Sequence, residues 1–190
     1  IYTNVRYPFP ANPPNIPHEY NPVGSYRYWF EMPKEWHGRE IFIHFAAVKS
    51  AMYLWINGQK LGYSQGSKLP AEFNITDFVV RGNNLLALEV YRWSDGSYLE
   101  DQDFWRLSGI ERDVYIYSTP KVRISDFFAQ PKLVERYENG QLDLEIAILN
   151  ESKKKMKDLS IEAQLIDAEG KKVIPGPLRE EFSLDKFEEL

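Results

Sequence analysis

The sequence contains no cysteine, which excludes a disulfide framework and any metal site built on thiolates, and leaves the cellular compartment open. It also lacks an apolar run of the roughly 18 residues that a membrane helix needs, so no membrane partner is expected. Lys and Arg number 23 against 28 Asp and Glu and form no basic stripe, so nucleic acid is not an expected partner. His18, His37 and His44 are scattered, and nothing resembles a nucleophile elbow, so a Ser-His-Asp triad is not indicated.

Aromatic residues are abundant, at 15% of the chain. They fit a β-rich core, because aromatic side chains favour strands. They also fit sugar recognition, in which aromatic faces cover the apolar surface of a sugar. Composition alone favours a β-rich core over sugar recognition as the reason for these aromatic residues.

Alternating or apolar runs predict strands at residues 25–31, 40–45, 51–56, 59–63, 73–78, 84–93 and 113–118. Asn57-Gly58 separates two of these runs and predicts a tight hairpin, since a type I′ turn requires positive φ at both central residues. Residues 1–22 are rich in Pro and Asn and predict an extended arm that lies on another part of the protein. Short strands without an amphipathic helix indicate an all-β jelly roll or sandwich.

The composition changes at Thr119-Pro120, after which aromatics become fewer and Lys and Glu more frequent. Strands are expected at residues 122–129, 142–149 and 159–166, with turns at Asn139-Gly140 and 167–170. We therefore expect two domains, a jelly roll over residues 1–119 and an immunoglobulin-like β-sandwich, partial or complete, over 120–190.

Residues 92–114 (RWSDGSYLEDQDFWRLSGIERDV) predict a functional loop, because so dense a mixture of acids, arginines and tryptophans is rarely buried flat in a sheet. Its acids Asp95, Glu100, Asp101 and Asp103 could bind a hard cation through oxygen ligands. The alternative is that they form salt bridges; the arginines available are Arg92, Arg106 and Arg112. Two carboxylates can also hydrolyse glycosides, but this loop offers no identifiable pair. The residues alone predict a β-rich domain with a polar or metal-binding loop.

The same run strongly resembles the N-terminal domain of large bacterial β-galactosidases of glycoside hydrolase family 2. The resemblance extends to IYTNVRYPFPANPPNIPHEYNPVGSY, LWINGQKLGYSQGSKLPAEFNIT and the RISDF at residues 123–127. It implies a galactose-binding-like jelly roll, then an immunoglobulin-like domain, then a (β/α)8 barrel that carries two catalytic glutamates. It also implies a retaining enzyme that hydrolyses terminal β-D-galactosides and is a homo-oligomer when full length.

The resemblance also implies roles for four residues, none of them catalytic. Asn21 of EYNPVG resembles an asparagine that lines the galactose subsite, although HEYNP carries one extra residue relative to the family pattern. Asp103 of DQDFW resembles an aspartate that binds sodium, and this ion in turn contacts the 6-hydroxyl of the sugar. Gln65 of YSQGS and Asp95 of WSDGS resemble two ligands of a peripheral magnesium ion whose other ligands would precede Ile1.

Three hypotheses therefore remain open. The first is a fragment of a β-galactosidase that contributes substrate and metal contacts but is inactive without the barrel. The second is a free-standing carbohydrate-binding module, and the third is a structural domain that packs on the barrel and builds an oligomer. Within the loop, a purely structural role is expected for Arg92, Trp93, Trp105 and Arg106.

Overall fold

The computed structural model describes residues 6–100 and 105–190. The chain divides into two compact units, Ile1–Thr119 and Pro120–Leu190, at the point where the composition changes. The units are described separately below. In the described ranges no helix has both the length and the apolar character needed to cross a membrane.

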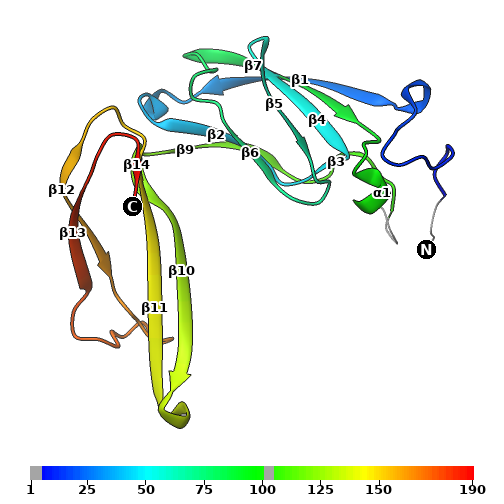
Figure 1. The fold of residues 1–190 in the computed structure, drawn as a ribbon. Coiled ribbons are helices and arrows are strands. Elements are labelled where there is room, and N and C mark those ends of the chain that lie inside the picture. Colours follow the sequence, from blue (N-terminus) through cyan, green and yellow to red (C-terminus); the bar gives the residue numbers. More distant parts are fainter. Residues whose placement is uncertain (1–5, 101–104) are drawn as a thin grey trace. The chain divides into compact units, whose positions relative to one another are not determined.

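Unit 1 is built on two antiparallel sheets (Figure 1). The four-stranded sheet has the order β1 (Val23–Met32), β7 (Gly82–Tyr91), β4 (Ala51–Ile56) and β5 (Gln59–Gln65). The three-stranded sheet has the order β6 (Ala71–Asn74), β2 (Glu40–Phe45) and β9 (Val114–Thr119). A short pair, β3 (Val48–Lys49) with β8 (Gly109–Ile110), lies beside them. The predicted all-β sandwich is therefore confirmed.

Alternation along the central strands places the core between the two sheets. In β2, Ile43 and Phe45 are 1% and 0% exposed, while the intervening His44 stacks on Tyr115 on the outer face. In β4, Leu54 and Ile56 are fully buried. Leu86, Leu88 and Val90 of β7 join the same cluster, so the inner faces of both sheets share one core. The period of two that predicted these strands is a direct consequence of this burial.

The hairpin at Asn57-Gly58 forms as predicted, with φ of 51° and 81° at the two residues. The side chain of Asn57 also makes hydrogen bonds that the preference of Asn-Gly for tight turns does not predict. The Asn57 amide donates to the carbonyl of Phe78 at 3.0 Å and to Oδ1 of the buried Asn84 at 2.8 Å. The turn is thereby fixed to the start of the neighbouring strand, β7.

Among the described residues of unit 1, the helical segments are short, as expected for a β-rich chain. They are η1 (His18–Tyr20), η2 (Lys34–Trp36) and α1 (Ser97–Glu100). The first belongs to the N-terminal arm and the last to the loop at residues 92–114, and both matter for the site described below.

Unit 2 consists of a long hairpin and a second strand pair. β10 (Val122–Val134) and β11 (Asn139–Asn150) pair along their whole length, and β14 (Glu188–Glu189) extends this sheet. The other sheet pairs β12 (Met156–Ala163) with β13 (Leu178–Leu184). In residues 120–190, all of which are described, the buried apolar side chains are Ile148 and Leu184. This unit therefore has a much smaller buried core than unit 1.

The structure corrects the sequence analysis at several points in these units. The turn predicted at Asn139-Gly140 is wrong, because β11 begins at Asn139 and η3 (Glu135–Tyr137) makes the reversal. The strands β3, β8, β13 and β14 were not predicted. Three of them are two residues long, and β13 (LREEFSL) is mostly charged and exposed, so none carries an apolar pattern.

Candidate functional site

The loop after β7 is held at its start by Asn21. The Asn21 amide donates to the carbonyl of Trp93 at 2.9 Å, and its Oδ1 accepts the Trp93 backbone N–H, also at 2.9 Å. The backbone N–H of Arg92 donates to the carbonyl of Pro22 at 3.0 Å. Asn21 was predicted to line a sugar subsite. Here one donor and one acceptor position of its amide already serve the loop, and one of each remains.

The N-terminal arm packs on this loop through aromatic rings. Tyr7 and Phe9 lie against the 3% exposed indole of Trp93, with ring centroids 5.9 Å and 5.4 Å away. The Tyr7 hydroxyl donates to the carbonyl of Ser97 at 2.8 Å, and the Tyr98 hydroxyl donates to the carbonyl of Asn15 at 2.8 Å. The predicted arm is therefore confirmed for its described residues, and the surface it lies on is the loop.

A second set of contacts holds the C-terminal half of the loop. The guanidinium of Arg106 lies 3.5 Å from the ring centre of Tyr7, a close cation–π contact. Lys49, only 1% exposed, donates from Nζ to the carbonyl of Trp105 at 2.8 Å. A buried ammonium is rare unless it is paired, so Lys49 is a strong local constraint. These contacts agree with the structural role expected for Trp93 and Arg106.

A buried group of three hydroxyls, which the sequence did not predict, lies beneath the loop. Ser50 donates to Ser94 Oγ at 2.5 Å, and Ser97 donates to Ser50 Oγ at 3.2 Å. The backbone N–H of Ser94 donates to Ser97 Oγ at 3.1 Å. Serine is too common for its presence to predict such a group, and Ser50 is 44 residues from Ser94 in the chain.

Two acids of the loop, Asp95 and Glu100, form an acidic cluster near Tyr63, at the end of β5. The Tyr63 hydroxyl donates to Gln65 Oε1, and Ser67 donates to Glu100 Oε2. Burial raises the pKa of Tyr63, and the neighbouring Tyr53, Asp95 and Glu100 raise it further. Asp95 and Gln65, the two predicted magnesium ligands, therefore both lie close to Tyr63.

A pocket of about 650 Å³ adjoins this acidic cluster. Tyr53, Tyr63, Tyr91 and Trp93 supply its aromatic wall, Asp95 supplies a carboxylate, and residues of the arm, including Asn15 and His18, close the other side. Aromatic faces with a few convergent polar groups are the usual lining of a small-molecule site.

The salt bridges considered as an alternative for these acids do not form between the described residues of the loop. Among the described residues, Arg92, Arg106 and Arg112 form no ion pair; Arg92 lies over the Trp93 ring at 5.4 Å instead. Asp95 accepts the backbone N–H of Gly96 at 2.9 Å. Arg92 and Arg106 thus pack on aromatic rings.

Asp101 and Asp103, the latter being the predicted sodium ligand, lie outside the described residues. Within residues 6–100 and 105–190, no three His, Cys, Asp or Glu side chains come together as a metal site. Asp95 and Gln65 supply oxygen donors of the kind Mg²⁺ prefers, but they form only part of a six-ligand shell.

Comparison with known proteins decides the family. The model of the glycosyl hydrolases family 2 sugar binding domain matches residues 1–120. The chain belongs to glycosyl hydrolase family 2. A β-galactosidase of Priestia megaterium is 49% identical over 187 residues, which cover 96% of this chain and 18% of the relative. A β-galactosidase of Clostridium acetobutylicum is 42% identical over 176 residues, covering 90% of this chain and 19% of the relative.

Solved structures of other proteins share the fold of this family 2 chain. The β-glucuronidase 2 of Bacteroides uniformis superposes with a TM-score of 0.80 at 23% identity, over 90% of this chain and 21% of that one. A putative β-galactosidase of Bacteroides fragilis gives 0.76 at 19% identity, over 90% and 26%. At such identities the likeness is one of fold alone. The family 2 chain described here spans less than a fifth of the length of the curated relatives given above.

Proposed function

We propose that residues 1–190 are the sugar-binding N-terminal part of a retaining β-galactosidase that hydrolyses terminal β-D-galactosides. The observation that carries this proposal is the 49% identity to the Priestia megaterium β-galactosidase across 96% of the chain. The β-galactosidase of Clostridium acetobutylicum, 42% identical over 90% of the chain, supports the same substrate class.

The chemistry is proposed to take place in a (β/α)8 barrel elsewhere in the parent protein, where two glutamates act as acid/base and nucleophile. The present chain would supply accessory contacts. Asn21 has one amide N–H and one lone pair beyond its two bonds to Trp93, and these are offered to the sugar.

Asp103 is proposed to bind a sodium ion, which orders a sugar hydroxyl without moving a proton. The described residues on either side of it are held by hydrogen bonds: Lys49 donates to the carbonyl of Trp105, and Ser94 and Ser97 bond to the buried Ser50.

Gln65 and Asp95 are proposed as two oxygen ligands of a magnesium ion, with the remaining ligands coming from other parts of the parent protein or from water. Asp95→Asn in the parent protein should bind Mg²⁺ more weakly by calorimetry. Asp77→Asn, an exposed acid on the turn after β6, is the matched control. Equal Mg²⁺ affinity in both variants would remove Asp95 from the site.

The test of the proposal as a whole uses sodium. In the parent protein, Asp103→Ala should weaken galactoside binding and abolish activation by Na⁺ at constant ionic strength. Asp113→Ala, an exposed acid of the same loop, should leave both unchanged. Residues 1–190 alone should not cleave a chromogenic galactoside. Measurable turnover by the pure fragment, or unaltered sodium activation in Asp103→Ala, would contradict the proposal.

A further inference from the structure

The N-terminal arm has little regular structure of its own, so its contacts with the loop at residues 92–114 determine where it lies. In the described part of the arm, residues 6–22, the regular structure is the short helix η1 and one isolated bridge between Asn12 and Asn15. Proline is frequent in this segment and lacks the backbone N–H that internal hydrogen bonds require. The residues that hold the arm therefore decide how its side chains are presented.

One tyrosine of the loop, Tyr98, closes a turn of the arm at residues 12–15. The backbone N–H of Asn12 donates to the Tyr98 hydroxyl at 3.2 Å, and this hydroxyl donates to the carbonyl of Asn15 at 2.8 Å. Within the turn, the N–H of Asn15 donates to the carbonyl of Asn12 at 2.8 Å, and the two residues between them are prolines. The Tyr98 hydroxyl thus binds both ends of the turn.

Tyr98 is itself held to the body of unit 1. It lies in α1, between Ser97, which donates to Ser50 Oγ at 3.2 Å, and Glu100, which accepts a hydrogen bond from Ser67. Ser50 and Ser67 are 0% and 1% exposed. Because α1 is bonded to buried residues on both sides of Tyr98, the side chain of Tyr98 offers the arm a fixed point.

The turn that Tyr98 holds is part of the candidate site. Its residues Pro14 and Asn15 line the pocket of about 650 Å³ from the side of the arm. Asn21, the proposed sugar contact, lies at the end of the same arm and bonds to Trp93. Loosening the turn therefore alters the arm next to the proposed sugar contact, while the bonds of Asn21 itself stay in place.

We propose that Tyr98 is a positioning residue for sugar binding. Its hydroxyl fixes the turn at residues 12–15 to the loop, and so presents the arm to the sugar in a single arrangement. Tyr98 acts through backbone groups of the arm and does not touch the sugar. This inference rests on the proposed function, because it gives the arm a part in binding the galactoside.

Tyr98→Phe removes the hydroxyl alone and keeps the ring, which packs on Tyr7 with the ring centroids 5.2 Å apart. In the purified parent protein, KM for a chromogenic β-D-galactoside should rise about five- to tenfold, because a neutral hydrogen bond changes an equilibrium by about fivefold and two are lost, in part to water. The value of kcat should change by less than about twofold, as for the loss of binding that substrate and transition state share. A purely structural role would reduce the amount of active protein, which lowers the apparent kcat and leaves KM unchanged.

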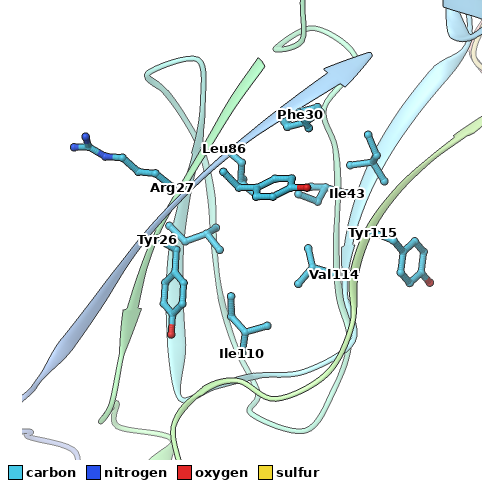
Figure 2. A pocket seen from close by; sticks show the side chains of 11 residues that line it. Tyr26, Arg27, Phe30, Ile43, Leu86, Ile110, Val114 and Tyr115 are labelled. Carbon is cyan, nitrogen blue, oxygen red and sulfur yellow. The ribbon is translucent and has the colours of Figure 1, made fainter. Parts of the chain in front are cut away.

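Tyr26→Phe is the matched control, since it deletes a hydroxyl from another tyrosine next to the loop. Tyr26 lies on β1 and lines a pocket together with Ile110, at the C-terminal end of the loop (Figure 2). Within the described ranges its hydroxyl forms no hydrogen bond, and its side chain does not contact the arm. KM should therefore stay at the native value in Tyr26→Phe.

Hydrogen exchange shows whether Tyr98 acts through the arm. In the parent protein, the arm peptide that contains Asn12 should exchange at least about fivefold faster in Tyr98→Phe, because the Asn12 N–H loses its acceptor, and at the native rate in Tyr26→Phe. With p-aminophenylalanine in place of Tyr98, an amino group returns a donor and an acceptor to the same position. This substitution should bring both KM and the exchange rate back towards the native values.

A higher KM together with faster exchange of the arm peptide supports the proposal. A higher KM with unchanged exchange, faster exchange with an unchanged KM, or equal changes in Tyr26→Phe would each overturn it. A parent protein that cleaves no galactoside would overturn the proposed function and this inference with it. Cleavage of the galactoside with an unchanged KM in Tyr98→Phe would overturn this inference alone.

Discussion

Asn21→Ala separates the structural role of this asparagine from its proposed role at the sugar. The side chain joins the end of the N-terminal arm to the first residues of the loop through two hydrogen bonds to Trp93, each 2.9 Å long. Alanine removes both. The main-chain N–H and C=O of Trp93, a residue only 3% exposed, then lose these partners.

The expected magnitude follows from these contacts. A hydrogen bond contributes about 1 kcal/mol net, and a buried group left without a partner costs about 1–3 kcal/mol. Some of this cost is recovered, because Asn21 is only partly buried and water can enter. We therefore expect the free energy of unfolding of unit 1 to fall by about 2 kcal/mol.

The assay is urea unfolding of residues 1–190, followed by tryptophan fluorescence. With an m-value of roughly 2 kcal/mol/M, the midpoint should fall by about 1 M. Asn15→Ala is the matched control. Asn15 lies in the same arm and is exposed, and its backbone makes hydrogen bonds to Asn12 and Tyr98. Asn21→Asp should be at least as damaging, because it turns the donor into an oxygen facing the Trp93 carbonyl.

An unchanged midpoint in Asn21→Ala would refute this reasoning. It would mean that the bonds to Trp93 do not hold the loop and that the amide is free. A fall of about 2 kcal/mol means that lost sugar affinity in the same variant must be corrected for a displaced loop before Asn21 is assigned to the subsite.

Three further predictions concern stability. Because the pKa of Tyr63 is raised in the folded state, its contribution to stability is present below pH ~10 and is lost as pH rises through the folded pKa. Tyr63→Phe should therefore reduce the loss of stability between pH 9 and 11 in urea titrations, and an unchanged loss would contradict this. Leu54→Ala, at a fully buried site, should destabilise unit 1 by about 2–5 kcal/mol in the same assay, whereas the 71% exposed Leu69 should tolerate alanine. Unit 2, with its small core, should unfold first in calorimetry of residues 1–190; a single transition would contradict this.

Strands with a buried inner face could be predicted closely from the sequence. The predicted strands at residues 40–45 and 51–56 match β2 and β4 at both ends, since each has Ile or Leu at alternate positions and lies in the middle of a sheet. β13 carries four charged or polar residues among seven and faces water over most of its length, so its partner β12 defines it more than its own sequence does.

The turn at Asn139-Gly140 shows why a local rule can fail. Asn-Gly favours positive φ, but here the reversal uses Glu135, Arg136 and Tyr137, with φ of 50°, 59° and 74°. Gly140 pairs with Leu133 inside the hairpin. Register along the long β10–β11 ladder therefore determines where the turn lies, and the dipeptide does not.

The candidate site, too, could be predicted only in part from the sequence. The loop and its acids were visible in the sequence, because charge and aromatics are concentrated there. The hydrogen bonds that hold the loop were not visible in the sequence, because Asn21 is 72 residues from Trp93 and Lys49 is 56 residues from Trp105. Such pairings depend on the folded sheet order, and no local pattern contains them.

The most direct measurement of the central claim is the ratio of kcat/KM for a chromogenic β-D-galactoside to that for the matching β-D-glucuronide, with the purified parent protein. The assignment to a β-galactosidase predicts a strong preference for the galactoside, in line with the 42–49% identity to the two curated enzymes. Preference for the glucuronide would contradict it, and would leave only the family and the fold.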